Sequence, residues 1–114
     1  MSELEQYLSL ASAEHDTNNG KDLVLAMEAV SRAIVRVGAL LAEAEHTLLL
    51  KVRNVREGLV QYEFSEARLR EEIRIDTVEE QATVGVLKAL LTGLNGRFKS
   101  LQSALSYLKS EMRL

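Results

Sequence analysis

The chain has 114 residues, a net charge of -3 and neither cysteine nor proline. Without cysteine it can form no disulfide and offers no thiolate ligand or thiol nucleophile. It has no apolar run of about 18 residues, so we expect no membrane span. The acidic N-terminus lacks the basic and apolar regions of a signal peptide. These features predict a single domain, residues 1–114, in the cytoplasm.

A short helix, a loop and a long helix are predicted in the first half of the chain. Residues 2–15 form the short helix, and residues 16–21 form the loop because turn-forming residues dominate there. The long helix covers residues 22–62, with Asp22 as its N-cap. Its apolar residues recur at alternating steps of three and four, as in an amphipathic helix. They are Leu23, Met27, Val30, Ile34, Val37, Leu41, Ala44, Leu48, Val52, Val55, Leu59 and Tyr62.

A charged connector is predicted over residues 63–76. We expect a short helix in it at residues 65–72. Ile73 and Ile75 alternate with polar residues, which favours a brief extended segment after that helix.

A second long helix is predicted over residues 77–112. Asp76 and Glu79 have the spacing of a capping box at its start. We expect the helix to continue through Gly93 and Gly96, because the apolar heptad pattern keeps its phase across them. The nine heptad positions are Val84, Leu87, Leu91, Leu94, Phe98, Leu101, Leu105, Leu108 and Met112.

Two long helices with a short connector most simply fold back on each other. We therefore predict an all-α fold, a short N-terminal helix plus a coiled-coil-like antiparallel hairpin of residues 22–62 and 77–112. Two helices cannot bury both apolar stripes, so a homo-oligomer is expected. Residues 1–20 hold four acidic and no basic residues, whereas residues 87–114 hold five basic and one acidic, which favours complementary packing. The predicted oligomer contacts are Leu94, Phe98, Leu101, Leu105, Leu108 and Met112.

The sequence contains little that indicates a catalytic or metal site. Glu43 and His46 have the spacing used in di-iron carboxylate bundles, but such a site needs a second motif and two further carboxylates. The other histidine, His15, lies beside the predicted loop. We therefore predict no enzymatic activity, no catalytic or metal-binding residue and no cofactor. A magnesium site like that of all-helical nucleotide pyrophosphohydrolases stays open as an alternative, although capping and solubility explain its acidic residues more simply. It would require convergence of Glu71, Glu72, Asp76 and Glu79.

Basic residues indicate a different function, the binding of phosphate groups. Lys51, Arg53 and Arg56 lie on the first long helix and are expected to project away from its apolar seam, while Arg97 and Lys99 lie on the last helix. In a hairpin these groups can form a stripe that binds nucleic acid without reading its sequence. The alternative is an ordinary solvated helix face. With no Trp and only five Tyr and Phe residues, we do not expect a platform for stacking bases.

Several features follow one another in a particular order from residue 43 to residue 113. An acidic stretch precedes a Lys-x-Arg element and a glycine, and then come a charged connector and a leucine-patterned end. The residues concerned are Glu43, Glu45, Lys51, Val52, Arg53, Gly58, Ser65, Glu66, Arg68, Asp76, Thr77 and the segment 101–113. This pattern resembles the UvsY-like recombination mediators of T-even phages.

The resemblance implies a ring-like oligomer that holds single-stranded DNA and helps to load a strand-exchange recombinase against a single-strand-binding protein. It implies that Lys51 and Arg53 contact DNA and that the last helix carries the oligomer contacts. If a phage encodes the protein, its compartment is the host cell cytoplasm. The acidic N-terminal helix departs from the family pattern. The alternative function is that of a protein–protein adaptor, a phage-encoded inhibitor or a structural component, without DNA contact.

Overall fold

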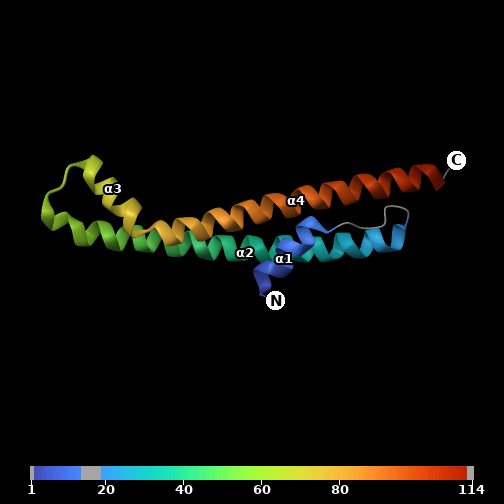
Figure 1. Ribbon diagram of the computed structural model, residues 1–114, viewed down its shortest axis with the longest axis horizontal. Coiled ribbons are helices and arrows are strands. Elements are labelled where there is room, and N and C mark those ends of the chain that lie inside the picture. Colours follow the sequence, from blue (N-terminus) through green and yellow to red (C-terminus); the bar gives the residue numbers. More distant parts are fainter. Residues whose placement is uncertain (1, 14–18, 113–114) are drawn as a thin grey trace. The chain divides into compact units, whose positions relative to one another are not determined.

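The computed structural model describes residues 2–13 and 19–112, and its regular secondary structure within these ranges is entirely helical (Figure 1). The predicted all-α class, with a short N-terminal helix and a long helix, is confirmed. The chain divides into two compact units: unit 1 consists of Met1–Gly38 and Lys88–Leu114, and unit 2 of Ala39–Leu87. The helices are α1 (Glu3–Ser12), α2 (Gly20–Leu59), the 3-10 turn η1 (Val60–Tyr62), α3 (Glu66–Asp76) and α4 (Val78–Met112).

A capping box starts α1. The Ser2 hydroxyl accepts a hydrogen bond from the backbone N–H of Glu5 (3.2 Å), and the Glu5 carboxylate accepts one from the backbone N–H of Ser2 (3.3 Å). An ion pair joins α1 to α2 within unit 1, with Arg36 Nε 2.8 Å from Glu3 Oε1. The hydrogen bond from Arg36 lowers the pKa of Glu3, so this contact holds a carboxylate at neutral pH.

The start of α2 differs from the prediction. The helix begins at Gly20, and the side-chain oxygen of Asn19 accepts a hydrogen bond from the backbone N–H of Asp22 (3.2 Å). Asn19 is therefore the cap, and the prediction that Asp22 caps the helix was wrong. Asp22 lies in the first turn, where a negative charge is favourable to the helix dipole. Residues 16–18 of the predicted loop and His15 lie outside the described residues, while Gly20 and Lys21 belong to α2.

Unit 1 combines α1, the first half of α2 and most of α4 around an aliphatic core. Here α2 and α4 run in opposite directions, since Gly20 lies beside Leu108 and Arg32 lines the same hollow as Phe98. Small residues let helices approach: a Cβ placed on Gly93 of α4 would lie only 3.7 Å from Cβ of Ala11 in α1. Five predicted seam positions are buried here: Leu23, Val30, Val37, Leu94 and Leu101. Ala26, Ala33 and Leu90 are also buried, although the sequence did not place them on a seam.

In unit 2, α3 occupies most of the predicted connector. Its N-cap is Ser65, whose hydroxyl accepts a hydrogen bond from the backbone N–H three residues on (3.2 Å). Leu69 and Ile73 are both buried, and a spacing of four puts them on one face of a helix. This shared burial explains why the helix continues to Asp76 and why the predicted extended backbone at Ile73 and Ile75 was wrong.

Thr77, a fully buried polar residue, separates α3 from α4. Its hydroxyl donates a hydrogen bond to the carbonyl of Ile73 (2.8 Å) and accepts one from Nε2 of Gln81 (2.8 Å). Asp76 is the last residue of α3, so the predicted capping box between Asp76 and Glu79 was wrong. The backbone passes from α3 into α4 through Thr77, whose hydroxyl is hydrogen-bonded to a residue of each helix, Ile73 in α3 and Gln81 in α4.

The prediction that α4 runs through Gly93 and Gly96 is confirmed, because the helix is continuous from Val78 to Met112. Apolar heptad residues lie on both sides of the glycines, and their burial offsets the weak helix propensity of glycine. In unit 2 the buried heptad residues are Val84 and Leu87, and in unit 1 they are Leu94 and Leu101.

Candidate nucleic-acid interface

Lys51, the first residue of the Lys-x-Arg element, is engaged inside unit 2. Its Nζ lies 2.8 and 2.9 Å from the two carboxylate oxygens of Glu80 on α4, and the Glu80 side chain is only 17% exposed. This hydrogen bond raises the pKa of Lys51 and lowers that of Glu80. The pair therefore remains charged at neutral pH, and it is lost in acid when Glu80 is protonated or in strong alkali when Lys51 is deprotonated. Lys51 joins α2 to α4, and the prediction that it projects away from the seam was wrong.

Arg53 and Arg56 lie on another side of α2. At about 100° per residue the two are roughly 60° apart around the helix, whereas Arg53 is roughly 160° from Lys51. Arg53 Nε lies 3.2 Å from Glu57 Oε1, and the two side chains are 73% and 66% exposed. An exposed i,i+4 pair of this kind contributes about 0.3–0.5 kcal/mol, so a phosphate can displace the carboxylate. Arg56 is exposed in the last turn of α2.

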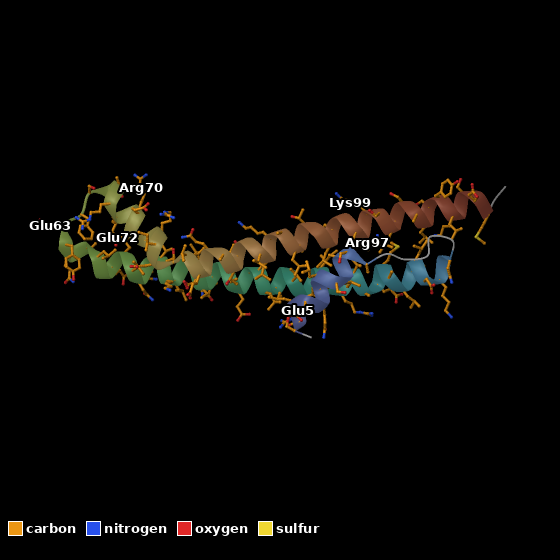
Figure 2. All side chains as sticks on the ribbon, viewed as in Figure 1. Glu5, Glu63, Arg70, Glu72, Arg97 and Lys99 are labelled. Carbon is orange, nitrogen blue, oxygen red and sulfur yellow. The ribbon has the colours of Figure 1, made fainter. Side chains whose placement is uncertain are left out.

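The other two predicted contact residues lie on α4 in unit 1. Lys99 is exposed and Arg97 is half-buried (Figure 2). Lys51, Arg53 and Arg56 belong to unit 2. The five basic residues are thus shared between the two units, and the stripe along both helices stays a prediction.

Arg53 and Arg56 belong to a unit whose net charge is negative. Unit 2 contains six Lys and Arg residues and ten Asp and Glu residues, a net charge of -4, while unit 1 contains eight and seven, a net charge of +1. A polyanion gains no long-range attraction from a unit of net negative charge. Any contact between unit 2 and DNA must therefore be made locally, by particular side chains.

Two of the five aromatic side chains gather in the segment between α2 and α3. The rings of Tyr62 and Phe64 stack with their centroids 5.6 Å apart and their planes inclined by 17°, and the guanidinium of Arg68 lies 4.1 Å from the Phe64 centroid. Glu63, between the two aromatic residues, has a left-handed backbone (φ 52°, ψ 39°) and lies beyond the end of α2 (Figure 2). We call Tyr62, Phe64 and Arg68 the aromatic turn. The sequence prediction missed it, although the i,i+4 spacing of Phe64 and Arg68 was an available signal.

One of the acidic residues considered for a magnesium site, Glu71, forms an ion pair with a basic residue. Two guanidinium nitrogens of Arg74 lie 2.6 and 3.1 Å from the carboxylate oxygens of Glu71. Glu43 and His46 are both exposed on α2. Within residues 2–13 and 19–112, no three His, Cys, Asp or Glu side chains form a group that can hold a metal ion. The ion pair with Arg74 gives Glu71 a structural role on α3.

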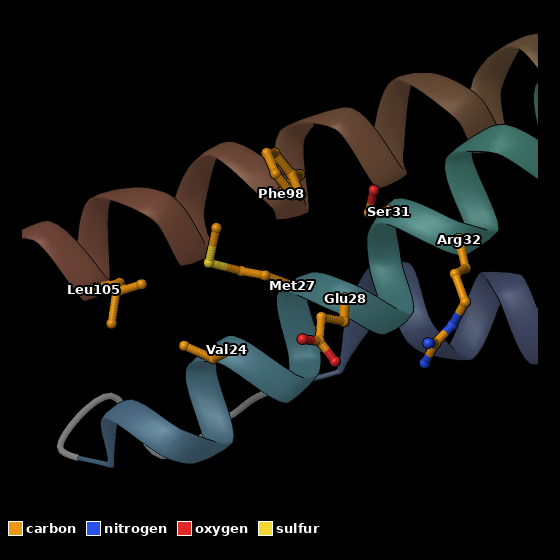
Figure 3. Close-up of a pocket in the computed structure, with 7 residues that line it drawn as sticks. All are labelled: Val24, Met27, Glu28, Ser31, Arg32, Phe98 and Leu105. Carbon is orange, nitrogen blue, oxygen red and sulfur yellow. The ribbon is translucent and has the colours of Figure 1, made fainter.

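An apolar groove lies between the start of α2 and the end of α4 in unit 1 (Figure 3). It consists of two hollows of about 520 and 420 Å³, which share Val24 and Leu105. Of the predicted oligomer contacts, Leu94 and Leu101 are 0% and 2% exposed, which places them in the core of unit 1. The other predicted contacts line the groove: Phe98, Leu105, Leu108 and Met112.

No family model, no curated protein and no solved structure matches this chain. The similarity to the phage recombination mediators therefore stays a resemblance in sequence pattern. Among the helices within residues 2–13 and 19–112, none is long and apolar enough to cross a membrane.

Proposed function

We propose that the protein is a non-enzymatic, oligomeric accessory factor of DNA recombination. In this role it binds single-stranded DNA without sequence preference and helps to load a recombinase in competition with a single-strand-binding protein. The resemblance over residues 43–113 motivates the proposal. The observation that carries it is the exposure of Arg53 and Arg56 on one side of α2, within the element that the resemblance assigns to DNA.

Within this proposal the phosphate contacts are Arg53 and Arg56, with Arg97 and Lys99 as further contacts. Guanidinium groups suit phosphate because they donate paired hydrogen bonds. Lys51 takes a positioning role, since both oxygens of Glu80 already bind its ammonium group. Releasing it would leave the largely buried carboxylate of Glu80 without its partner, which is unfavourable.

We further propose that α2 and α4 form the predicted antiparallel hairpin and that the apolar groove of unit 1 binds a second copy of the chain. Four heptad residues of α4 line the groove: Phe98, Leu105, Leu108 and Met112. Met112 is 79% exposed. The opposite net charges of residues 1–20 and 87–114 favour packing between these segments, within one chain or between copies. Assembly would place many weak phosphate contacts on one DNA strand, which raises the overall affinity.

DNA binding is tested with labelled single-stranded oligonucleotide over a series of salt concentrations. We expect wild-type affinity to fall linearly on a log–log plot, because bound phosphates release counterions. Arg53→Ala/Arg56→Ala should lower the slope by about 1.4, at about 0.7 for each lost contact on a single strand. Lys51→Ala should leave the slope nearly unchanged while lowering the melting temperature. An unchanged slope in the double variant would exclude these two arginines as DNA contacts.

Self-association is tested by analytical ultracentrifugation. Met112→Glu should weaken it roughly 10- to 150-fold, because burying a Met side chain contributes about 1.5–3 kcal/mol and a charge cannot replace that burial. Leu49→Glu is the matched control, since Leu49 is 68% exposed and belongs to unit 2. If both variants associate as the wild type does, the groove is not the contact between copies.

The second candidate function is a protein–protein adaptor without DNA contact, such as a phage-encoded inhibitor or a structural component. It is favoured by the net charge of -4 on unit 2 and by the carboxylate partners of Lys51 and Arg53. The same salt series separates the two functions, because an adaptor would not bind the oligonucleotide even at the lowest salt concentration.

A further inference from the structure

We propose that the aromatic turn is a stacking site for an unpaired nucleobase, with Tyr62 as the residue that contacts the base. This inference rests on the proposed function and adds a base contact to its phosphate contacts. Unpaired bases are the part of a single strand that aromatic side chains can hold, and such stacking tolerates every base because each presents a flat π-face.

The geometry of the aromatic turn suits this role. Tyr62 and Phe64 are nearly parallel, and the Arg68 guanidinium close to Phe64 restrains the second ring. Phe64 is half-buried, whereas Tyr62 is 59% exposed. Tyr62 therefore has an accessible ring whose orientation is already set by its neighbour. A base that stacks on a preorganised ring loses little of the binding free energy to side-chain ordering.

The backbone of Glu63 contributes to this arrangement. Glu63 lies in the sequence between the two residues whose rings stack. Its backbone is left-handed, a conformation that is unfavourable for a residue with a Cβ. Glycine is the usual residue at such a position after a helix. Strained backbone of this kind persists where the surrounding structure enforces it and is concentrated at functional sites.

Charge distinguishes this contact from the phosphate contacts. Exposed Glu63 and Glu66 lie in sequence between Tyr62 and Arg68 and outnumber the single positive charge of Arg68, so the segment 62–68 has a net charge of -1 and does not attract phosphate. Arg56, in the last turn of α2, lies at the end of the helix from which η1 and Tyr62 continue. In this arrangement an arginine near the end of α2 binds a phosphate of the DNA, and Tyr62 binds a base. Only the phosphate contact responds strongly to salt.

The test compares oligo(dT) with an abasic oligonucleotide of the same length, each titrated with the full chain over the same salt series. We expect wild type to bind oligo(dT) more tightly than the abasic strand. Tyr62→Ala should weaken binding to oligo(dT) by about 5- to 150-fold, the range for one stacked base, without changing the salt slope or the affinity for the abasic strand. Tyr62→Phe should retain binding because it keeps the ring. Tyr107→Ala, which removes a 69% exposed tyrosine from unit 1, is the control and should bind as the wild type does.

Each other outcome overturns the inference in a recognisable way. Equal wild-type affinity for both strands would reject base stacking and leave the phosphate contacts of the proposed function intact. An equal loss on both strands with Tyr62→Ala, accompanied by lower helicity in circular dichroism, would show that the ring supports only the fold. Failure of wild type to bind either strand at the lowest salt concentration would reject both the stacking site and the proposed function.

Discussion

Leu94→Ala should destabilise the protein by about 2–5 kcal/mol, the range for truncation of a buried leucine that leaves a cavity. Leu94 is 0% exposed and lies in the core of unit 1 with Val30 and Val37, which are also 0% exposed. Valine is β-branched and has few rotamers, so the buried valines of this unit can do little to fill a cavity. The measurement is urea unfolding followed by circular dichroism at 222 nm, a helix-sensitive wavelength, with the protein concentration held constant because association stabilises the folded state.

The control is Leu49→Ala, the same chemical change at a leucine that is 68% exposed on α2. It should change the free energy of unfolding by less than about 0.5 kcal/mol, as surface substitutions usually do. The comparison also addresses the original assignment of Leu94 to an oligomer contact. Were the loss in Leu94→Ala to disappear at low protein concentration, Leu94 would be acting between copies and not in the core of unit 1.

Thr77→Val should destabilise the protein by about 1–3 kcal/mol, although valine has nearly the same shape as threonine. The substitution removes the hydroxyl that donates to Ile73 and accepts from Gln81 in a site with no solvent access. Water cannot replace the lost partners at this position. The amide of Gln81 retains its weaker hydrogen bond to the carbonyl of Arg74 (3.2 Å), which limits the loss.

Thr92→Val provides a matched control for this prediction. Thr92 also donates its hydroxyl to the carbonyl four residues earlier, Lys88 (3.0 Å), but it is exposed on α4. Solvent can satisfy the freed carbonyl, so we expect a change below about 0.5 kcal/mol. Equal effects of the two substitutions in thermal unfolding would mean that burial at Thr77 does not set the cost of losing the hydroxyl.

The long helices could be predicted because their apolar residues recur at alternating steps of three and four residues. Leu23, Val30 and Val37 were placed on one face by spacing alone, and the structure buries all three. The same apolar spacing correctly predicted that α4 continues through Gly93 and Gly96. A short helix was also predicted at residues 65–72, but its end was predicted too early, because charged residues outnumber apolar ones in α3 and only Leu69 and Ile73 are buried.

The predicted site was harder to assess from the sequence, because it depends on contacts between distant residues. Lys51 was assigned to DNA from its place in a short element, but the residue that binds it, Glu80, is 29 positions away. No local pattern indicates such a pair. The aromatic turn was overlooked for another reason. A count of aromatic residues contains no information on their placement, and the stacking of Tyr62 on Phe64 accompanies an unusual backbone conformation at Glu63.

The division of the chain into two units has a consequence for biosynthesis. Unit 2 is one uninterrupted segment, Ala39–Leu87, whereas unit 1 needs chain from both sides of it. On the ribosome, residues 88–112 follow unit 2 by roughly 1–5 s at about 5–20 residues per second. During that interval the nascent chain contains Leu23, Val30 and Val37 but not Leu94 and Leu101, so the core of unit 1 is incomplete. A chaperone that binds apolar segments would have its substrate in this period.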